Sequence, residues 1–162
     1  MKKIVFTFII GLMVSTSSYC QIIWQKAEKG MTVAQVKKNF PKAQNVQPTD
    51  GTTLGDGALR LLELSDYEIN NFKFDAFFYF KDGKLIQVTL KAKQSENQTL
   101  AYKKMVEAFR MKYGEEKSTN NMSIGQEKLW ITKDKTEITV SLLGGDMNIY
   151  YSARIGNELN KI

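Results

Sequence analysis

The stretch FKFDAFFYF, residues 72–80, shows the clearest two-residue period in the chain. Successive side chains of a β-strand point to opposite faces of the sheet, so this alternation predicts a strand with one buried face. The face predicted to be buried carries Phe72, Phe74, Ala76, Phe78 and Phe80, and the other face carries Lys73, Asp75, Phe77 and Tyr79. We therefore expect a half-covered antiparallel sheet, with this strand running over about 70–80.

The segments on either side of this strand extend the same pattern. Residues 81–84, Lys-Asp-Gly-Lys, are typical of a tight hairpin turn. They lead into a strand near 85–92, whose buried side is expected to hold Ile86, Val88 and Leu90. A further strand is expected near 58–65, after a polar, glycine-containing loop at 44–57.

A short helix is expected before that loop. Thr32 and Gln35 have the spacing of a capping box, in which each side chain satisfies a free backbone donor of the first turn. Val36 and Phe40 lie on one helical stripe, and Pro41 ends the helix.

The second part of the chain repeats this order. Ser95 and Gln98 repeat the capping-box spacing, and an apolar stripe predicts a helix that ends at Gly114. A polar turn is expected over 117–125, followed by strands near 127–132, 136–143 and 147–154. The sequence thus predicts an α+β fold in which two αβββ units, 30–93 and 95–154, form an antiparallel sheet with both helices on one face. We expect one domain over 21–156 and a flexible tail at 157–162.

One short motif resembles a known family. Gly30-Met31-Thr32, with Val36 four residues on and Pro41 closing the helix, resembles the Gly-Met-Thr-x-x-x-Val opening of the small outer-membrane assembly lipoproteins (the SmpA/OmlA family). The order of one helix and then strands is also similar to the group that shares the β-lactamase-inhibitor-protein type of fold. The resemblance implies an α+β binding module of the cell envelope that works through protein contacts, with no particular partner.

The first 20 residues are typical of an export signal. Lys2 and Lys3 precede an apolar run from Ile4 to Val14, which is shorter than the ~20 residues needed to span a bilayer. We expect cleavage after Cys20 and a periplasmic or secreted protein. The alternative is a membrane-anchored lipoprotein with lipid on Cys20, although Tyr19 departs from the small residue expected before a lipidated cysteine.

Composition excludes several kinds of chemistry. The chain has no histidine, which removes the commonest general base and transition-metal ligand. It contains neither a phosphate-binding glycine motif nor a Ser-x-x-Lys motif. The formal charge is +6, or +4 without Lys2 and Lys3, and its lysines are scattered, which argues against a nucleic-acid surface. We therefore expect no enzyme activity, catalytic residue, cofactor or metal, although a carboxylate pair such as Asp75 with Glu63 would allow a hydrolase.

Two kinds of binding function follow from the predicted sheet. The first is a cell-envelope interaction module that binds an envelope or extracellular protein, with weak membrane association if Cys20 is lipidated. Its candidate contact residues are Phe77, Tyr79, Lys73 and Trp24. The other segments could instead cover Phe77 and Tyr79, and Trp24 could pack over the start of the first helix. The second function is a carrier of a small apolar ligand between sheet and helices, lined by Phe74, Phe78, Val106 and Phe109.

Overall fold

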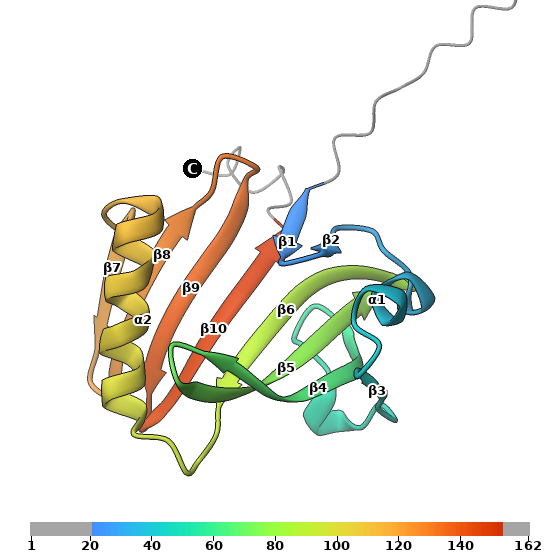
Figure 1. Ribbon diagram of the computed structural model, residues 1–162, viewed down its shortest axis with the longest axis horizontal. Coiled ribbons are helices and arrows are strands. Elements are labelled where there is room, and N and C mark those ends of the chain that lie inside the picture. Colours follow the sequence, from blue (N-terminus) through green and yellow to red (C-terminus); the bar gives the residue numbers. More distant parts are fainter. Residues whose placement is uncertain (1–20, 154–162) are drawn as a thin grey trace, which may run out of the picture.

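The computed structural model describes residues 21–153 and consists of one large sheet with two helices (Figure 1). Eight strands pair antiparallel in the order β3-β4-β5-β6-β10-β9-β8-β7. Their bounds are β3 (Gln44–Asn45), β4 (Leu59–Ile69), β5 (Phe72–Lys81), β6 (Lys84–Ala92), β7 (Ser118–Met122), β8 (Gly125–Ile131), β9 (Thr136–Leu143) and β10 (Asp146–Ala153). The pairing of β6 with β10 joins the N-terminal and C-terminal halves of the sheet.

Outside this sheet, the described chain contains two helices, a two-stranded ribbon and a 3₁₀ turn. Helix α1 (Val33–Asn39) belongs to the N-terminal half and helix α2 (Gln98–Tyr113) to the C-terminal half. A separate two-stranded ribbon, β1 (Ile22–Trp24) with β2 (Ala27–Glu28), precedes α1. A 3₁₀ turn, η1 (Asp50–Thr52), lies in the segment between β3 and β4. No helix within residues 21–153 is long and apolar enough to cross a bilayer.

One row of buried side chains crosses the face that the helices cover. In the strand register, Phe78 lies opposite Val88, Val88 opposite Tyr151, and Tyr151 opposite Ile138. Helix α2 packs on β9 and β10, with the Phe109 ring 6.3 Å from the Tyr151 ring. The ring of Phe40, at the end of α1, lies 5.2 Å from that of Phe78. The α+β class and the antiparallel sheet are thus as predicted.

Helix α1 begins as the sequence predicts, whereas α2 does not. The Thr32 amide donates to Gln35 Oε1 at 2.8 Å, and the Gln35 amide donates to Thr32 Oγ1 at 3.4 Å, so the capping box is confirmed. The predicted box of Ser95 and Gln98 is wrong. Asn97 caps α2, its Oδ1 accepting from the Leu100 amide at 3.0 Å, whereas Gln98 Nε2 donates to the Lys93 carbonyl at 2.6 Å.

The strand around residues 72–80 is confirmed. Phe74, Ala76, Phe78 and Phe80 are buried, and Phe72 is half-buried. The following turn has positive φ at Asp82 (49°) and Gly83 (71°), the backbone that a two-residue hairpin requires.

The polar turn predicted over 117–125 is wrong. Residues 118–122 form β7, which pairs with β8 and ends the sheet on one side. All five of its side chains are exposed, so no apolar alternation marks it in the sequence. The expected loop at 44–57 likewise contains β3 and η1. The expected leader with Cys20 and the expected tail at 157–162 lie outside the described residues.

Candidate functional site

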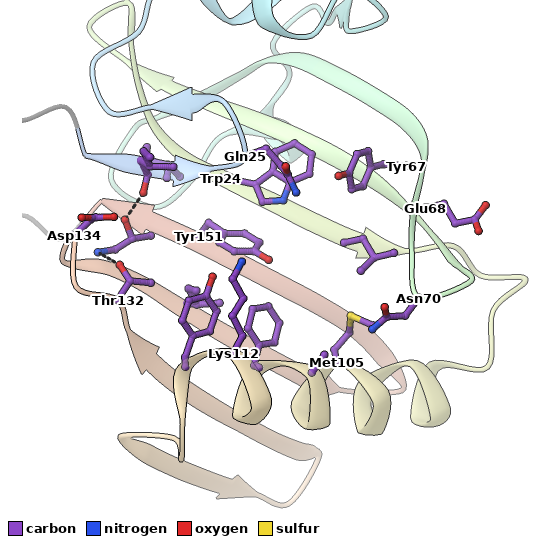
Figure 2. A pocket seen from close by; sticks show the side chains of 18 residues that line it. Trp24, Gln25, Tyr67, Glu68, Asn70, Met105, Lys112, Thr132, Asp134 and Tyr151 are labelled. Carbon is purple, nitrogen blue, oxygen red and sulfur yellow. Dashed lines mark hydrogen bonds between the residues drawn. The ribbon is translucent and has the colours of Figure 1, made fainter.

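A cleft of about 760 Å³ opens on the helix-covered side of the sheet (Figure 2). One wall is the C-terminal part of α2, and the opposite wall combines β1 with the end of the β4–β5 hairpin. The floor is formed by side chains of β9 and β10, and the turn after β8 closes one end. The cleft therefore lies where the two halves of the sheet meet.

The first wall of the cleft is one face of helix α2. Met105, Ala108, Phe109, Lys112 and Tyr113 follow one another at spacings of three, one, three and one residues, which places them on one face of α2. The rings of Phe109 and Tyr113 stack, with centroids 5.7 Å apart and planes 16° from parallel. This wall therefore combines two stacked aromatic rings with Met105, Ala108 and one lysine.

A bulge in β4 supplies part of the second wall. Leu64 pairs with Ala76, but the next paired residue is Tyr67, which lies opposite Phe74. Three residues of β4 thus match two of β5, and side chains change from even to odd positions on the helix-covered face. As a result, Tyr67 and Ile69 face the cleft.

The bulge is held by an ionic cluster on the other side of the hairpin. Asp66 has φ 55°, and its amide donates to Asp75 Oδ1 at 3.3 Å. Lys93 Nζ lies 3.0 Å from Asp75 Oδ1 and 3.3 Å from Asp66 Oδ1, and these carboxylates raise the pKa of Lys93. The cluster keeps Asp66 in its left-handed conformation, so it also orients Tyr67.

Trp24 joins the second wall to the floor. Only 4% of its surface is exposed. Its ring stacks on Phe40, with centroids 5.4 Å apart and planes 7° from parallel, and meets Tyr67 edge-on at 4.8 Å. It also lies 6.5 Å from Tyr151 of the C-terminal half. Trp24 thus packs at the end of α1, whereas the sequence analysis placed it over the helix start.

Polar groups also line the cleft. Besides the hydroxyls of its three tyrosines, they belong to Gln25, Glu68, Asn70, Lys112, Thr132, Asp134 and Thr136. The Tyr151 side chain is buried, and its pKa is raised, first by desolvation and then by the hydroxyls of Tyr113 and Tyr67. Lys112 Nζ lies 5.0 Å from the centre of the Tyr113 ring. Figure 2 shows the Lys112 side chain pointing from α2 toward the middle of the cleft. The arrangement can therefore hold an apolar body and bond a polar group.

The four candidate contact residues do not share one surface. Trp24 lies on the helix-covered side, and Lys73, Phe77 and Tyr79 lie on the opposite side. Lys73 is exposed, Phe77 is half-buried beneath Arg60, whose Cζ is 4.5 Å from the ring centre, and Tyr79 is 9% exposed. Their role in partner binding stays a prediction.

The residues expected to line a ligand cavity are mostly elsewhere. Phe109 lines the cleft, whereas Phe74, Phe78 and Val106 are packed in the core and are not among the lining residues. Of the proposed carboxylate pair, Asp75 is bonded to Lys93, and Glu63 accepts from the Ser65 hydroxyl at 3.3 Å. Within residues 21–153, no group of three or more acidic or cysteine side chains is positioned to hold a metal ion.

Several residues of the cleft were not singled out from the sequence as binding residues. In the sequence, Tyr113 and Tyr151 belong to apolar stripes of their helix and strand, and no motif marks Lys112. One signal was available for Tyr67. Apolar residues at 62 and 64 are followed by apolar residues at 67 and 69, and this change of parity is what a bulge produces.

No family model, curated protein or solved structure matches this chain. The likeness of the segment from Gly30 to Pro41 to the small outer-membrane assembly lipoproteins therefore stays a prediction.

Proposed function

We propose that this chain is a non-catalytic binding protein of the extracytoplasmic space that holds a small, largely apolar ligand in the cleft between α2 and β1. The observation that carries the proposal is the cleft itself, at about 760 Å³, which is lined by aromatic side chains from α2, β1, β4 and β10 together with aliphatic and polar ones. Sites for small molecules commonly occupy ~300–1,000 Å³ and combine apolar walls with a few polar groups. This proposal replaces the predicted lining of Phe74, Phe78 and Val106 with residues from α2, β1 and the β4 bulge.

The two-unit organisation supports this proposal. We interpret the halves as αβββ-type units, each extended by one further strand, that share a sheet through β6 and β10. A cleft at the junction of two such units is bounded by side chains from both, as Tyr67 and Phe109 illustrate. Ligand binding would then stabilise the two halves against each other.

A neutral apolar probe tests the proposal. We expect N-phenyl-1-naphthylamine to bind the purified protein, with a rise in its fluorescence. Ala108→Phe should abolish this binding, because Ala108 lines the cleft and a phenyl ring there would fill it. The matched control is Met111→Phe, on the same helix but 84% exposed and not a lining residue, which should bind as the unchanged protein does.

Two results would contradict the proposal. One is a probe that does not bind at all, and the other is a probe that binds Ala108→Phe as well as Met111→Phe. Native mass spectrometry of freshly purified protein offers a second measurement. A retained ligand should add mass to the unchanged protein and not to Ala108→Phe.

The opposite face of the sheet supports a second proposal, in which an envelope protein docks there. Phe77 lies opposite Thr89, Thr89 opposite Tyr150, and Tyr150 opposite Thr139, and the register continues to Leu129. The aromatic and leucine side chains of this row are half-buried, and within the described chain both helices contact the other face. Half-exposed apolar groups in a row favour contact with another protein.

The test of this second proposal uses Phe77→Asp and Leu129→Asp, since the more buried Tyr79 would also affect stability. A partner that crosslinks to the unchanged protein in its own host should be lost from both variants. The melting temperature should stay close to that of the unchanged protein. A partner retained by both variants would contradict docking on this face.

A further inference from the structure

Lys112 places a positive charge in the cleft. Its side chain is exposed, and Figure 2 shows it directed from α2 toward the space above β10. Within residues 21–153, Lys112 has a cation–π contact with the ring of Tyr113 and forms no salt bridge with a carboxylate. An ammonium group beside apolar walls is incompletely solvated when a ligand covers it, so it favours a ligand that brings a negative charge.

The acidic residues of the cleft lie away from this charge. Figure 2 shows Glu68 and Asp134 at opposite ends of the cleft, with Lys112 between them. Each has a basic neighbour, because Glu68 pairs in register with Lys73, and Asp134 lies between two lysines in sequence. The middle of the cleft therefore carries the positive charge, and the ends are closer to neutral.

Phenol hydroxyls supply hydrogen-bond donors near the same place. Tyr67, Tyr113 and Tyr151 all line the cleft. A tyrosine hydroxyl is protonated at neutral pH, and burial raises the pKa of Tyr151 further. A carboxylate oxygen accepts hydrogen bonds from such groups, and an ammonium ligand would instead meet Lys112 with like charge.

We propose that the ligand class is an amphipathic carboxylate, with one negative head group and an apolar body of medium length. This inference rests on the proposed function of the cleft. The head group lies on Lys112 with a phenol hydroxyl as second donor, and the body lies against Phe109, Ile69 and Ile138. The carboxylate distinguishes this class from alcohols and amines with the same chain.

Competition with N-phenyl-1-naphthylamine tests the head group. Decanoate, decan-1-ol and decylamine share the ten-carbon chain and differ in charge. On the unchanged protein we expect decanoate to displace the probe at a concentration about tenfold lower than decan-1-ol, as a charge-assisted hydrogen bond would give. Decylamine should be the weakest competitor, because it carries the same charge as Lys112.

Matched variants assign the preference to one residue. Lys112→Met should lose the advantage of decanoate over decan-1-ol, with both competitors compared at the probe affinity measured for that variant. Lys103→Met is the control, since Lys103 is exposed on the same helix and is not a lining residue, and it should keep the advantage. Tyr113→Phe retains the ring that stacks on Phe109 and removes the hydroxyl. It should reduce the advantage about two- to threefold, because the hydroxyl donates a stronger hydrogen bond to a carboxylate than to an alcohol.

The outcomes separate this inference from the proposed function. If the probe binds and decan-1-ol competes as well as decanoate, the carboxylate class is wrong and the cleft function stands. The class is also wrong if Lys112→Met keeps the preference for decanoate. If neither the probe nor decanoate, measured directly by calorimetry, binds the unchanged protein, both the function and the ligand class are wrong.

Discussion

The two halves of the sheet are covered by helices of very different length. At 1.5 Å per residue, α2 with its 16 residues is about 24 Å long, and α1 with its 7 residues is about 10 Å long. Strand β4, with 11 residues, extends over about 35 Å. Helix α1 therefore covers only one end of the N-terminal half, and the cleft lies where this half has no helix above it.

Different interactions hold the two helices in place. Trp130 Nε1 of β8 donates to the Gly114 carbonyl at 2.9 Å, and Glu116 joins Arg110 at the end of α2 to Lys128 of β8. On the other half, α1 packs through the buried Val36 and through the ring of Phe40 against Trp24, and Asn39 Nδ2 donates to the Lys26 carbonyl at 2.8 Å. Both helices thus have polar and apolar anchors, and the anchor of α2 includes an ionic network with Glu116.

The largest expected effect comes from Trp24→Ala, because the ring of Trp24 packs against side chains of both halves on the helix-covered face. Trp24 contacts Phe40 and Phe78 of the N-terminal half and Tyr151 of the C-terminal half. We expect a loss of about 3–5 kcal/mol in the free energy of unfolding, measured in urea, as for other buried tryptophans. The exposed neighbour Ile22 provides a control, and Ile22→Ala should change this free energy by less than about 1 kcal/mol. A loss below that value for Trp24→Ala would show that the halves do not depend on this ring.

Strands β5 and β7 show which parts of the fold can be predicted from the sequence. Alternation predicts β5 because five apolar side chains mark one face, and this depends on local sequence alone. Strand β7 has no such mark, since it forms only because β8 offers it backbone partners at the edge of the sheet. The cleft is less predictable still, because it results from the difference in helix length, the position of β1 and the bulge at Asp66 together.

The next largest effect on stability is expected from the ionic network of Arg110, Glu116 and Lys128 at the end of α2, and this effect depends on pH. Hydrogen bonds from Arg110 and then Lys128 hold the pKa of Glu116 well below its usual range. A pKa lowered in the folded state stabilises the fold above the unfolded-state pKa of about 4.3, and this contribution is lost as the pH falls below that value. At pH 7, Glu116→Gln should lower the free energy of unfolding by about 1–2 kcal/mol.

The pH profile distinguishes this anchor from a general effect of charge. Stability of the unchanged protein should fall between pH 4.5 and pH 2 more steeply than that of Glu116→Gln. Glu107→Gln removes an exposed pair with Lys104 and should cost less than about 0.5 kcal/mol, with an unchanged profile. Parallel profiles for the unchanged protein and Glu116→Gln would show that Glu116 is not the group that titrates.

Substitutions at Asp66 test whether the bulge in β4 positions the cleft wall of the N-terminal half. Valine is strained at φ 55°, and glycine is not, so Asp66→Val should be less stable than Asp66→Gly by about 1–2 kcal/mol. Both variants lose the carboxylate that Lys93 contacts, and their difference therefore reports on the backbone. Asp66→Val should also bind N-phenyl-1-naphthylamine more weakly than Asp66→Gly, because Tyr67 and Ile69 depend on the bulge. Equal probe affinities would separate the bulge from the cleft.

The smallest effects concern the helix caps and compare the two halves directly. Asn97→Ala removes the 3.0 Å bond to the Leu100 amide and should cost about 1 kcal/mol, measured in urea. Thr32→Ala removes the 3.4 Å bond from the Gln35 amide and the exposed 3.1 Å bond of the Thr32 hydroxyl to Gln35 Oε1. The Thr32 amide can still donate to Gln35, so about 0.5 kcal/mol is expected. Hydrogen exchange should show faster opening of α1 after Thr32→Ala and of α2 after Asn97→Ala. If Thr32→Ala instead has the larger cost, the capping box stabilises α1 more than the Asn97 cap stabilises α2. In that case α1 is held mainly by its own first turn.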